Sequence, residues 1–539
     1  MIICSGVVAN AGTAIGSVMV YKRADKTAEN YKVDDAEQEI LRFEEAKQRT
    51  IESLQMLYLK ASEQAGEESA MIFEVHQMMM NDPEYCSSVI GIIKEERWNA
   101  EYAVELTATK LSNVFLAMDN DYFRERATDI LDVSKRLIAV LSGQEEDRIN
   151  AKEPVILLAD DLVPSETVQL DKNLILGFVT QQGSINSHTA ILSRTMDIPA
   201  LIGVDMELSE HLDGTLAIID GESGKIYIDP DEKTILQMKK KQEQEQARKE
   251  LLKELKGKDT ITKSGKEINL YANIGSPEDA QKALEQDAEG IGLFRSEFLY
   301  LENEHFPTEE EQFIAYKAVA EKMEGKKVII RTMDIGADKQ ASYFDLGEEE
   351  NPALGYRAIR ICLNQTELFK TQLRAIFRAS AYGRISVMFP MIISVAEVHA
   401  IKKLVEEVKK ELQEEGISFS KVELGIMIET PAAVMISDML AKEVDFFSIG
   451  TNDLTQYTLA IDRQNQKLDS IYEPHHPAIL RMIEMVIKNA HENSIWAGIC
   501  GELASDMELT ETFLQMEVDE LSVSAGMVLE LRNKIRNLD

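Results

Sequence analysis

The chain has 539 residues, which is too long for one ordinary domain and predicts about three, and its hydrophobic fraction of 44% is typical of a folded soluble protein. A formal net charge of −36 argues against binding to nucleic acids or anionic membranes and favours a partner with a basic docking patch. Four scattered cysteines without a CxxC pair, no apolar run of about 20 residues and no basic N-terminal segment together predict a cytoplasmic protein without membrane insertion.

The N-terminal region predicts an α/β domain that carries an all-helical insertion. Residues 2–21 alternate β-forming residues with Gly and Ala, whereas apolar residues recur at helical spacing across 34–143. Strand patterns then return at 155–159, 174–180, 216–220 and 225–228. We therefore assign 1–33 and 144–230 to one α/β domain and 34–143 to a helical domain inserted into it.

A methionine-rich run in the helical region leaves two interpretations open. Met78–Met80 lie beside Phe73 and His76 in the sequence. Methionine side chains either fill irregular gaps in a core or form a soft docking surface for a partner protein. The sequence does not separate these alternatives.

A candidate nucleophile, His188, lies in the second half of the α/β domain. It follows a strand-like run at 174–179 and a Gly-Ser-Ile-Asn-Ser loop, and a helical pattern begins at about Thr189. A helix N-terminus keeps an imidazole neutral and therefore nucleophilic, and it also stabilises a phosphoryl group attached to that imidazole. Taken alone, these residues favour a hydrogen-bonded histidine that caps a turn over a nucleophile.

A charged connector separates this region from a second fold. Residues 231–256 have a helical pattern with too few apolar positions for a core, so we assign 231–259 to an exposed, stiff helical linker that takes up domain motion. From 260 to 539 strand and helix patterns alternate, which predicts a (β/α)8 barrel of the TIM type. The candidate strands are 268–274, 290–295, 328–333, 385–391, 423–428, 446–450, 495–500 and 520–523.

Charged and polar residues occur where these strands end, which is the face where such barrels bind their substrates. They are Arg295, Arg331, Asp334, Glu429, Asn452, Asp453 and Cys500. Arginines bind phosphate or carboxylate groups, and Glu429 and Asp453 offer hard oxygen ligands to Mg2+. The set predicts a site for a small polyanion and a metal ion; the alternative is that these residues pair only with each other across the barrel.

Several long segments carry a resemblance to a known family. They are LADDLVPSETVQL at 158–170, SHTAILSR at 187–194, GIGLFRSEFLY at 290–300, IIRTMDIGADK at 329–339, ENPALGYRAIR at 350–360, IETPAAV at 428–434, SIGTNDLTQYTLAIDR at 448–463 and GICGELASD at 498–506. Over essentially its whole length the chain resembles enzyme I of the bacterial sugar phosphotransferase system, the phosphoenolpyruvate-protein phosphotransferases. The resemblance implies a swivelling phosphohistidine α/β domain with a helical insertion, followed by a barrel.

The resemblance also implies a two-step phosphoryl transfer. Phosphoenolpyruvate would phosphorylate His188, and the phosphohistidine would pass its phosphoryl group to the histidine-containing carrier HPr. By motif match, the residues that hold phosphoenolpyruvate would be Arg295, Arg331, Asn452, Asp453 and Arg463. Glu429 and Asp453 would ligate Mg2+, and Cys500 would donate a proton to the methylene carbon. The family further implies HPr binding on the inserted helices and a homodimer through the barrel.

The sequence departs from the family's usual motifs near the candidate nucleophile. Where the family usually has two glycines and a threonine, this chain has Gly183, Ser184 and Asn186. Ser184 could restrict the approach of the backbone to the phosphoryl group and lower the rate. Further departures are the missing proline near Ala11 and the smaller residues Ala353 and Tyr356.

Three other functions compete with this interpretation. A phosphoenolpyruvate synthase or pyruvate phosphate dikinase would need a large N-terminal nucleotide-binding domain, for which the chain has no room. The nitrogen-related branch of enzyme I carries an additional N-terminal sensory domain, whereas this sequence begins directly at the first predicted strands. A regulatory paralogue that binds HPr-like carriers without turnover is supported only by Ser184 and Asn186.

Overall fold

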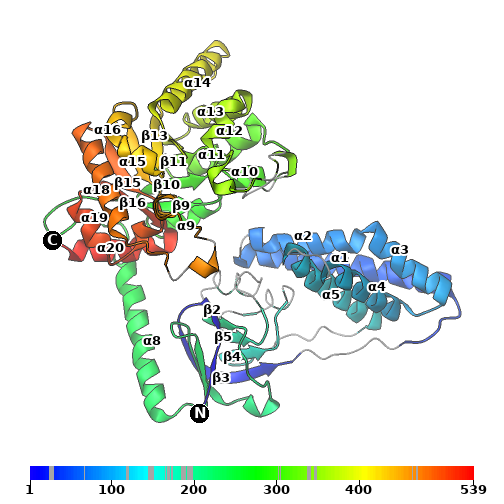
Figure 1. The fold of residues 1–539 in the computed structure, drawn as a ribbon. Helices are drawn as coiled ribbons and strands as arrows, with labels where there is room; N and C mark the ends of the chain where they lie inside the picture. Colours follow the sequence, from blue (N-terminus) through cyan, green and yellow to red (C-terminus); the bar gives the residue numbers. More distant parts are fainter. Residues whose placement is uncertain are drawn as a thin grey trace. The chain divides into compact units, whose positions relative to one another are not determined.

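The computed structural model describes most of the chain, in two compact units, Met1–Arg248 and Lys249–Asp539 (Figure 1). The described residues are 1–22, 30–65, 67–116, 121–143, 151–163, 166, 170–171, 174–183, 190, 193, 198–301, 303, 305–336, 342–344, 347, 349–463, 465–468 and 471–539. His188, Ser184 and Asn186 lie outside the described residues.

The first unit contains an eight-stranded mixed sheet in the order β1-β8-β7-β3-β4-β5-β6-β2. Its strands are β1 Ile2–Ser5, β2 Val7–Asn10, β3 Thr13–Tyr21, β4 Val155–Ala159, β5 Ile175–Thr180, β6 Ala200–Ile202, β7 Leu216–Asp220 and β8 Lys225–Ile228. The central strands β3 to β6 are parallel, and the outer strands pair antiparallel. In β4, Ile156 and Leu158 join one apolar cluster while Leu157 and Ala159 join another, so both faces of the sheet are buried.

Helices inserted between β3 and β4 form a separate bundle with its own core (Figure 1), as the sequence predicts. They are α1 Ala36–Ala65, α2 Glu67–Asn81, α3 Pro83–Gly91, α4 Ala100–Leu116 and α5 Asp121–Ser142. The turn before α3 has a local cause, because the Asp82 carboxylate accepts the backbone N–H groups of Glu84 and Tyr85.

The methionine-rich run of α2 divides between core and surface. Met80, Phe73 and His76 are fully buried, whereas 69% of Met78 is exposed. Met80 therefore fills the core of the bundle, whereas Met78 lies at its surface.

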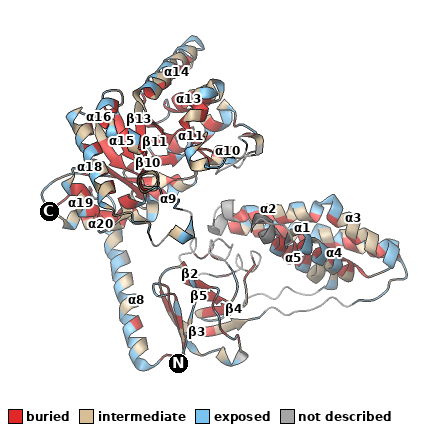
Figure 2. Ribbon diagram, in the orientation of Figure 1, coloured by how far each residue is buried: buried red, intermediate tan, exposed pale blue. Residues whose placement is uncertain are grey.

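The charged segment that follows the sheet is a single helix, α8 Glu232–Lys253. It is mostly exposed in Figure 2, but polar contacts attach it to the sheet of the first unit. Lys241 forms ion pairs with Asp220 at 2.7 Å and Glu222 at 2.5 Å, and Glu245 accepts hydrogen bonds from the backbone N–H and hydroxyl of Thr13. Part of the segment predicted to be an exposed linker thus packs against the α/β fold.

The second unit is a closed barrel of eight parallel strands, which confirms the predicted (β/α)8 fold. The strands are β9 Asn269–Ile274, β10 Gly290–Arg295, β11 Lys327–Arg331, β12 Ile385–Phe389, β13 Glu423–Ile428, β14 Phe446–Ile449, β15 Trp496–Ile499 and β16 Glu520–Ser524. The helices around them are α9 Asp279–Glu285, α10 Phe298–Leu301, α11 Glu309–Lys322, α12 Ile359–Asn364, α13 Thr366–Ala379, α14 Val395–Glu414, α15 Pro431–Met435, α16 Ser437–Leu440, α17 Thr451–Leu459, α18 Pro477–Glu492, α19 Thr510–Gln515 and α20 Val528–Asn537.

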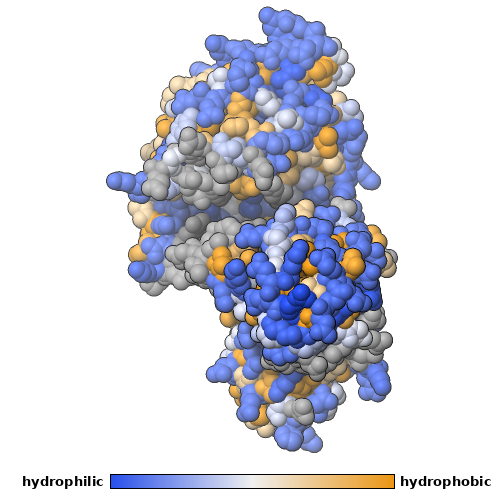
Figure 3. All heavy atoms as spheres, turned by 90° about the vertical axis from the view of Figure 1, so that its right-hand side faces the viewer, coloured by the Kyte–Doolittle hydropathy of each residue, from blue (hydrophilic) through white to orange (hydrophobic). Residues whose placement is uncertain are grey.

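Side chains of the barrel strands alternate between two cores. Tyr271, Ile329 and Met427 belong to a small cluster inside the barrel, and their sequence neighbours join the large cluster between strands and helices. The strands are therefore buried on both faces (Figure 2). The molecular face in Figure 3 is mainly hydrophilic with scattered apolar side chains. Among the described residues, no helix is both long and apolar enough to cross a lipid bilayer.

Candidate active site

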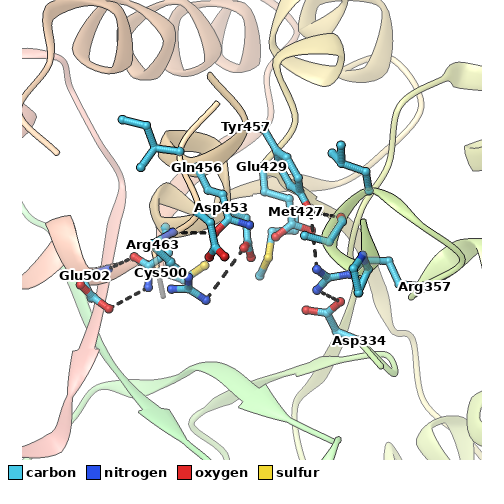
Figure 4. Close-up of a pocket in the computed structure, with 18 of the residues that line it drawn as sticks. Asp334, Arg357, Met427, Glu429, Asp453, Gln456, Tyr457, Arg463, Cys500 and Glu502 are labelled. Atoms are coloured by element: carbon cyan, nitrogen blue, oxygen red, sulfur yellow. Dashed lines mark hydrogen bonds and ion pairs between the residues drawn. The ribbon is translucent and has the colours of Figure 1, made fainter. Parts of the chain in front are cut away.

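A cavity of about 960 Å³ opens at the C-terminal ends of the barrel strands (Figure 4). Arg295 and Arg331 end β10 and β11, and Glu429 and Cys500 directly follow β13 and β15. The cavity is lined by all the barrel residues that the sequence predicts to act on substrate or metal: Arg295, Arg331, Glu429, Asn452, Asp453, Arg463 and Cys500. Folding therefore brings together side chains from five strand ends and from the loop after α17.

Arg331 is the central cation of the cavity wall. It is 6% exposed and forms ion pairs with Glu297 at 2.9 Å and with Asp334 at 3.1 Å. Burial opposes the charged form, but Glu297, Asp334 and Glu429 outweigh it and raise the pKa of Arg331 above its usual value. Its guanidinium is therefore permanently charged and held in one orientation.

Asp334 connects Arg331 to a second buried arginine, Arg357. One carboxylate oxygen contacts Arg331, and the other accepts from Arg357 at 2.8 Å. Arg357 also approaches the hydroxyl of Tyr457 at 3.5 Å (Figure 4). Neither Glu297 nor Arg357 is among the site residues predicted from the sequence. Glu297 could have been predicted from its position two residues after the end of β10, whereas Arg357 does not follow the end of a strand.

Glu429 is completely buried, with its two carboxylate oxygens in different environments. One oxygen accepts the backbone N–H of Met391 at 2.5 Å, and the other has no hydrogen-bond partner among the described residues. Burial raises the pKa of Glu429, and the nearby carboxylates of Asp453 and Asp334 raise it further. A buried carboxylate oxygen without a partner fits a hard cation such as Mg2+.

Asp453 is the only other predicted metal ligand in the cavity, and it lies 3.9 Å from Arg463. The described residues contain no cluster of three or more His, Cys, Asp or Glu side chains that would hold a metal by themselves. Two carboxylates nevertheless suit Mg2+, which usually retains several waters and binds substrate phosphates.

Cys500 provides a protonated thiol at the cavity. It is 3% exposed, and burial raises the pKa of its thiol to about 12. At neutral pH the group therefore retains its proton and is suited to be an acid rather than a nucleophile.

Asn452 lies in the first turn of α17 and bonds to Glu502, which follows β15. The Asn452 amide donates to a Glu502 carboxylate oxygen at 3.0 Å, and the backbone N–H of Glu502 donates to the amide oxygen at 2.8 Å. Both residues line the cavity, and Glu502 is not among the site residues predicted from the sequence.

Comparison with known proteins agrees with this architecture. The family model of the PEP-utilising enzyme, PEP-binding domain, matches residues 249–539. The models of the N-terminal and mobile domains of PEP-utilising enzymes match 5–126 and 151–224.

Similar proteins extend over nearly the whole chain. The phosphoenolpyruvate-protein phosphotransferase of Priestia megaterium is 43% identical over 99% of this chain and 93% of its own length. That of Bacillus subtilis (strain 168) is also 43% identical, over 99% of this chain and 94% of its own length. A solution structure of an Enzyme I protein (nEIt) is 35% identical and covers 45% of this chain and 99% of its own, with a TM-score of 0.39.

Proposed function

The chain belongs to the family of phosphoenolpyruvate-protein phosphotransferases, and we propose that it transfers a phosphoryl group from phosphoenolpyruvate to its own His188 and then to HPr, as the first step of sugar uptake. The cavity at the strand ends carries this proposal, because its lining brings Arg295, Arg331 and Arg463 together with the carboxylates of Glu429 and Asp453. Arginines neutralise a polyanion, and carboxylates bind the metal that accompanies phosphate groups. Arg295, Arg331, Asn452, Asp453 and Arg463 would hold the substrate.

In the first reaction, an imidazole nitrogen of His188 attacks the phosphorus atom of phosphoenolpyruvate. The bond between phosphorus and the enol oxygen breaks, and its electron pair remains on the enolate of pyruvate. The arginines stabilise the negative charge on the transferring group and on the enolate. Cys500 gives its thiol proton to the methylene carbon, pyruvate leaves, and the thiolate regains a proton from solvent.

Mg2+ is the cofactor that the donor set supports. Glu429 and Asp453 would hold it, and the bound ion would neutralise charge on the phosphate oxygens. Replacing Glu429 by Gln keeps the size of the side chain but removes its charge. We expect this variant to lose the Mg2+ dependence of phosphoenolpyruvate binding, as measured by titration calorimetry with and without the metal.

The helical bundle is the proposed docking region for HPr. Exposed apolar side chains on its helices α1 and α2 support this role; they are Leu41, Met56, Leu59, Met71 and Met78. Deleting residues 34–143 should preserve self-phosphorylation and abolish transfer to HPr. Unchanged transfer by this deletion variant would refute the docking role.

A homodimer through the barrel is the proposed assembly. Large apolar side chains exposed on this unit support an interface there; they include Leu354, Met435, Met439, Ile471 and Met485. Sedimentation equilibrium should give twice the chain mass of 60.7 kDa. A mass of one chain across the micromolar range would contradict the dimer.

The decisive experiment incubates the pure protein with Mg2+ and 32P-labelled phosphoenolpyruvate, with and without HPr. We expect an acid-labile, alkali-stable label that moves to HPr, as phosphohistidine chemistry requires. His188→Ala should abolish labelling and leave phosphoenolpyruvate binding nearly unchanged. Labelling of the variant at another residue would refute His188, and absence of label on the parent protein would favour the regulatory paralogue.

A further inference from the structure

Glu502 lies on the wall of the cavity (Figure 4), and two hydrogen bonds join it to Asn452, which also lines the cavity. Asn452 follows β14 and Glu502 follows β15, so the pair connects two adjacent strand ends. The amide group of Asn452 donates to Glu502 at 3.0 Å and accepts from its backbone N–H at 2.8 Å.

These two bonds determine which way the Asn452 amide faces. A carboxylate only accepts and a backbone N–H only donates, so the amide nitrogen must face the Glu502 side chain and the amide oxygen its backbone. An asparagine amide has two N–H groups. Glu502 accepts one of them, which leaves the other for a ligand in the cavity.

The position of Glu502 is otherwise unfavourable for the proposed substrate. It places a negative charge on the wall of a cavity that would bind a polyanion, and such a charge repels the ligand. Because Glu502 is exposed, salt at about 0.15 M weakens this repulsion considerably. A hydrogen bond to a charged acceptor retains more of its value, since it acts at short range.

We propose that Glu502 is a positioning residue for phosphoenolpyruvate. It holds Asn452 so that an N–H group, and not the amide oxygen, faces the anionic substrate. This inference rests on the proposed function, because it requires that Asn452 contacts phosphoenolpyruvate.

The test compares three replacements in the full-length protein. Glu502→Ala should raise the KM for phosphoenolpyruvate about three- to tenfold with little change in kcat, because it removes the acceptor that orients Asn452. Glu502→Gln retains an acceptor oxygen and should stay within about twofold of the parent protein. Glu508→Ala is the matched control, since Glu508 is an exposed carboxylate on the same loop that does not line the cavity; its KM should not change.

A double-mutant cycle separates positioning from other effects. Asn452→Ala combined with Glu502→Ala should have the same KM as Asn452→Ala alone, because Glu502 then has no amide to orient. A further increase in the double variant would overturn the proposal. A lower KM in both Glu502 variants would also overturn it, because it would show that the charge alone matters.

A binding measurement distinguishes failure of this inference from failure of the proposed function. The affinity for phosphoenolpyruvate is measured by calorimetry with Mg2+ in the His188→Ala variant, in which no turnover occurs and which serves as the parent for this comparison. Failure of this parent to bind phosphoenolpyruvate would refute the proposed function itself. If the His188→Ala protein binds phosphoenolpyruvate and the added Glu502→Ala replacement leaves its affinity unchanged, only the role of Glu502 is refuted.

Discussion

At the scale of single residues, burial decides the protonation state of Cys500. Burial raises the pKa of its thiol to about 12, and thiolates rather than thiols react with alkylating agents. At pH 8.5 iodoacetamide should therefore modify Cys500 at least about tenfold more slowly than the partly exposed Cys4, as measured by peptide mass spectrometry. The urea-unfolded chain is the control, in which both cysteines should react at similar rates. Equal rates in the folded protein would contradict a protonated, buried thiol.

A second buried acid, Glu520, lies at the start of β16 inside the barrel. It is 1% exposed, and glycines at 292 and 498 leave the space that its carboxyl group occupies. Burial raises the pKa of Glu520 well above its usual value. The folded protein therefore keeps this proton at pH values where the unfolded chain, with a pKa of about 4.3, has released it.

This difference makes the stability contribution of Glu520 depend on pH. Since the native state binds more protons, the free energy of unfolding falls as pH rises above the unfolded pKa. Glu520→Gln removes this loss, so its stabilising effect should be small near pH 4 and exceed about 1 kcal/mol at pH 8. Calorimetric melting of the barrel at both pH values measures it. The exposed Glu484→Gln is the control, and an equal effect of the two replacements would contradict the prediction.

At the scale of elements, the loop after β15 packs closely against the start of α17 because residue 501 is a glycine. A Cβ atom on Gly501 would overlap the hydroxyl of Thr451 and lie 2.6 Å from its backbone nitrogen. Gly501→Ala should displace the start of α17 at a cost of about 1–3 kcal/mol and raise the KM for phosphoenolpyruvate, because Asn452 and Asp453 lie in that turn.

Gly526→Ala is the matched control for this junction, since its new methyl group would meet no atom within 4 Å. Melting temperature and KM should both stay near those of the parent protein. If Gly501→Ala also left the melting temperature and the KM unchanged, the position of Asn452 would not depend on close packing between Gly501 and Thr451.

At the scale of the whole molecule, the net charge of −36 predicts how the protein meets its partner. An acidic surface attracts a basic docking patch over long range, and salt screens that attraction. The rate of transfer to HPr should fall about tenfold between 0.05 and 0.5 M NaCl, whereas self-phosphorylation should change much less because it needs no second protein. Quenched-flow experiments with labelled phosphoenolpyruvate measure the rates of the two steps separately. Equal salt dependence of both would contradict electrostatic docking.

Much of the architecture follows from the sequence by itself, because its causes are local. Alternating strand and helix patterns after residue 260 predict the barrel, and the eight predicted strands match β9 to β16 with ends that differ by at most two residues. Arg295 and Glu429 are predicted cavity residues because side chains at the ends of parallel strands meet at one face of a barrel. That rule needs only the order of strands and loops along the chain.

Other features depend on contacts between distant parts of the chain, which only the tertiary structure decided. The ion pair between Arg357 and Asp334 and the hydrogen bond between Asn452 and Glu502 each join residues that only folding brings together. Likewise, helical geometry buries Met80 and exposes Met78, although the two residues are close neighbours in one motif. Sequence patterns specify which elements form and where they end, but the environment of a side chain, and with it the charge and pairing of groups such as Cys500 and Glu429, arises only when the elements pack.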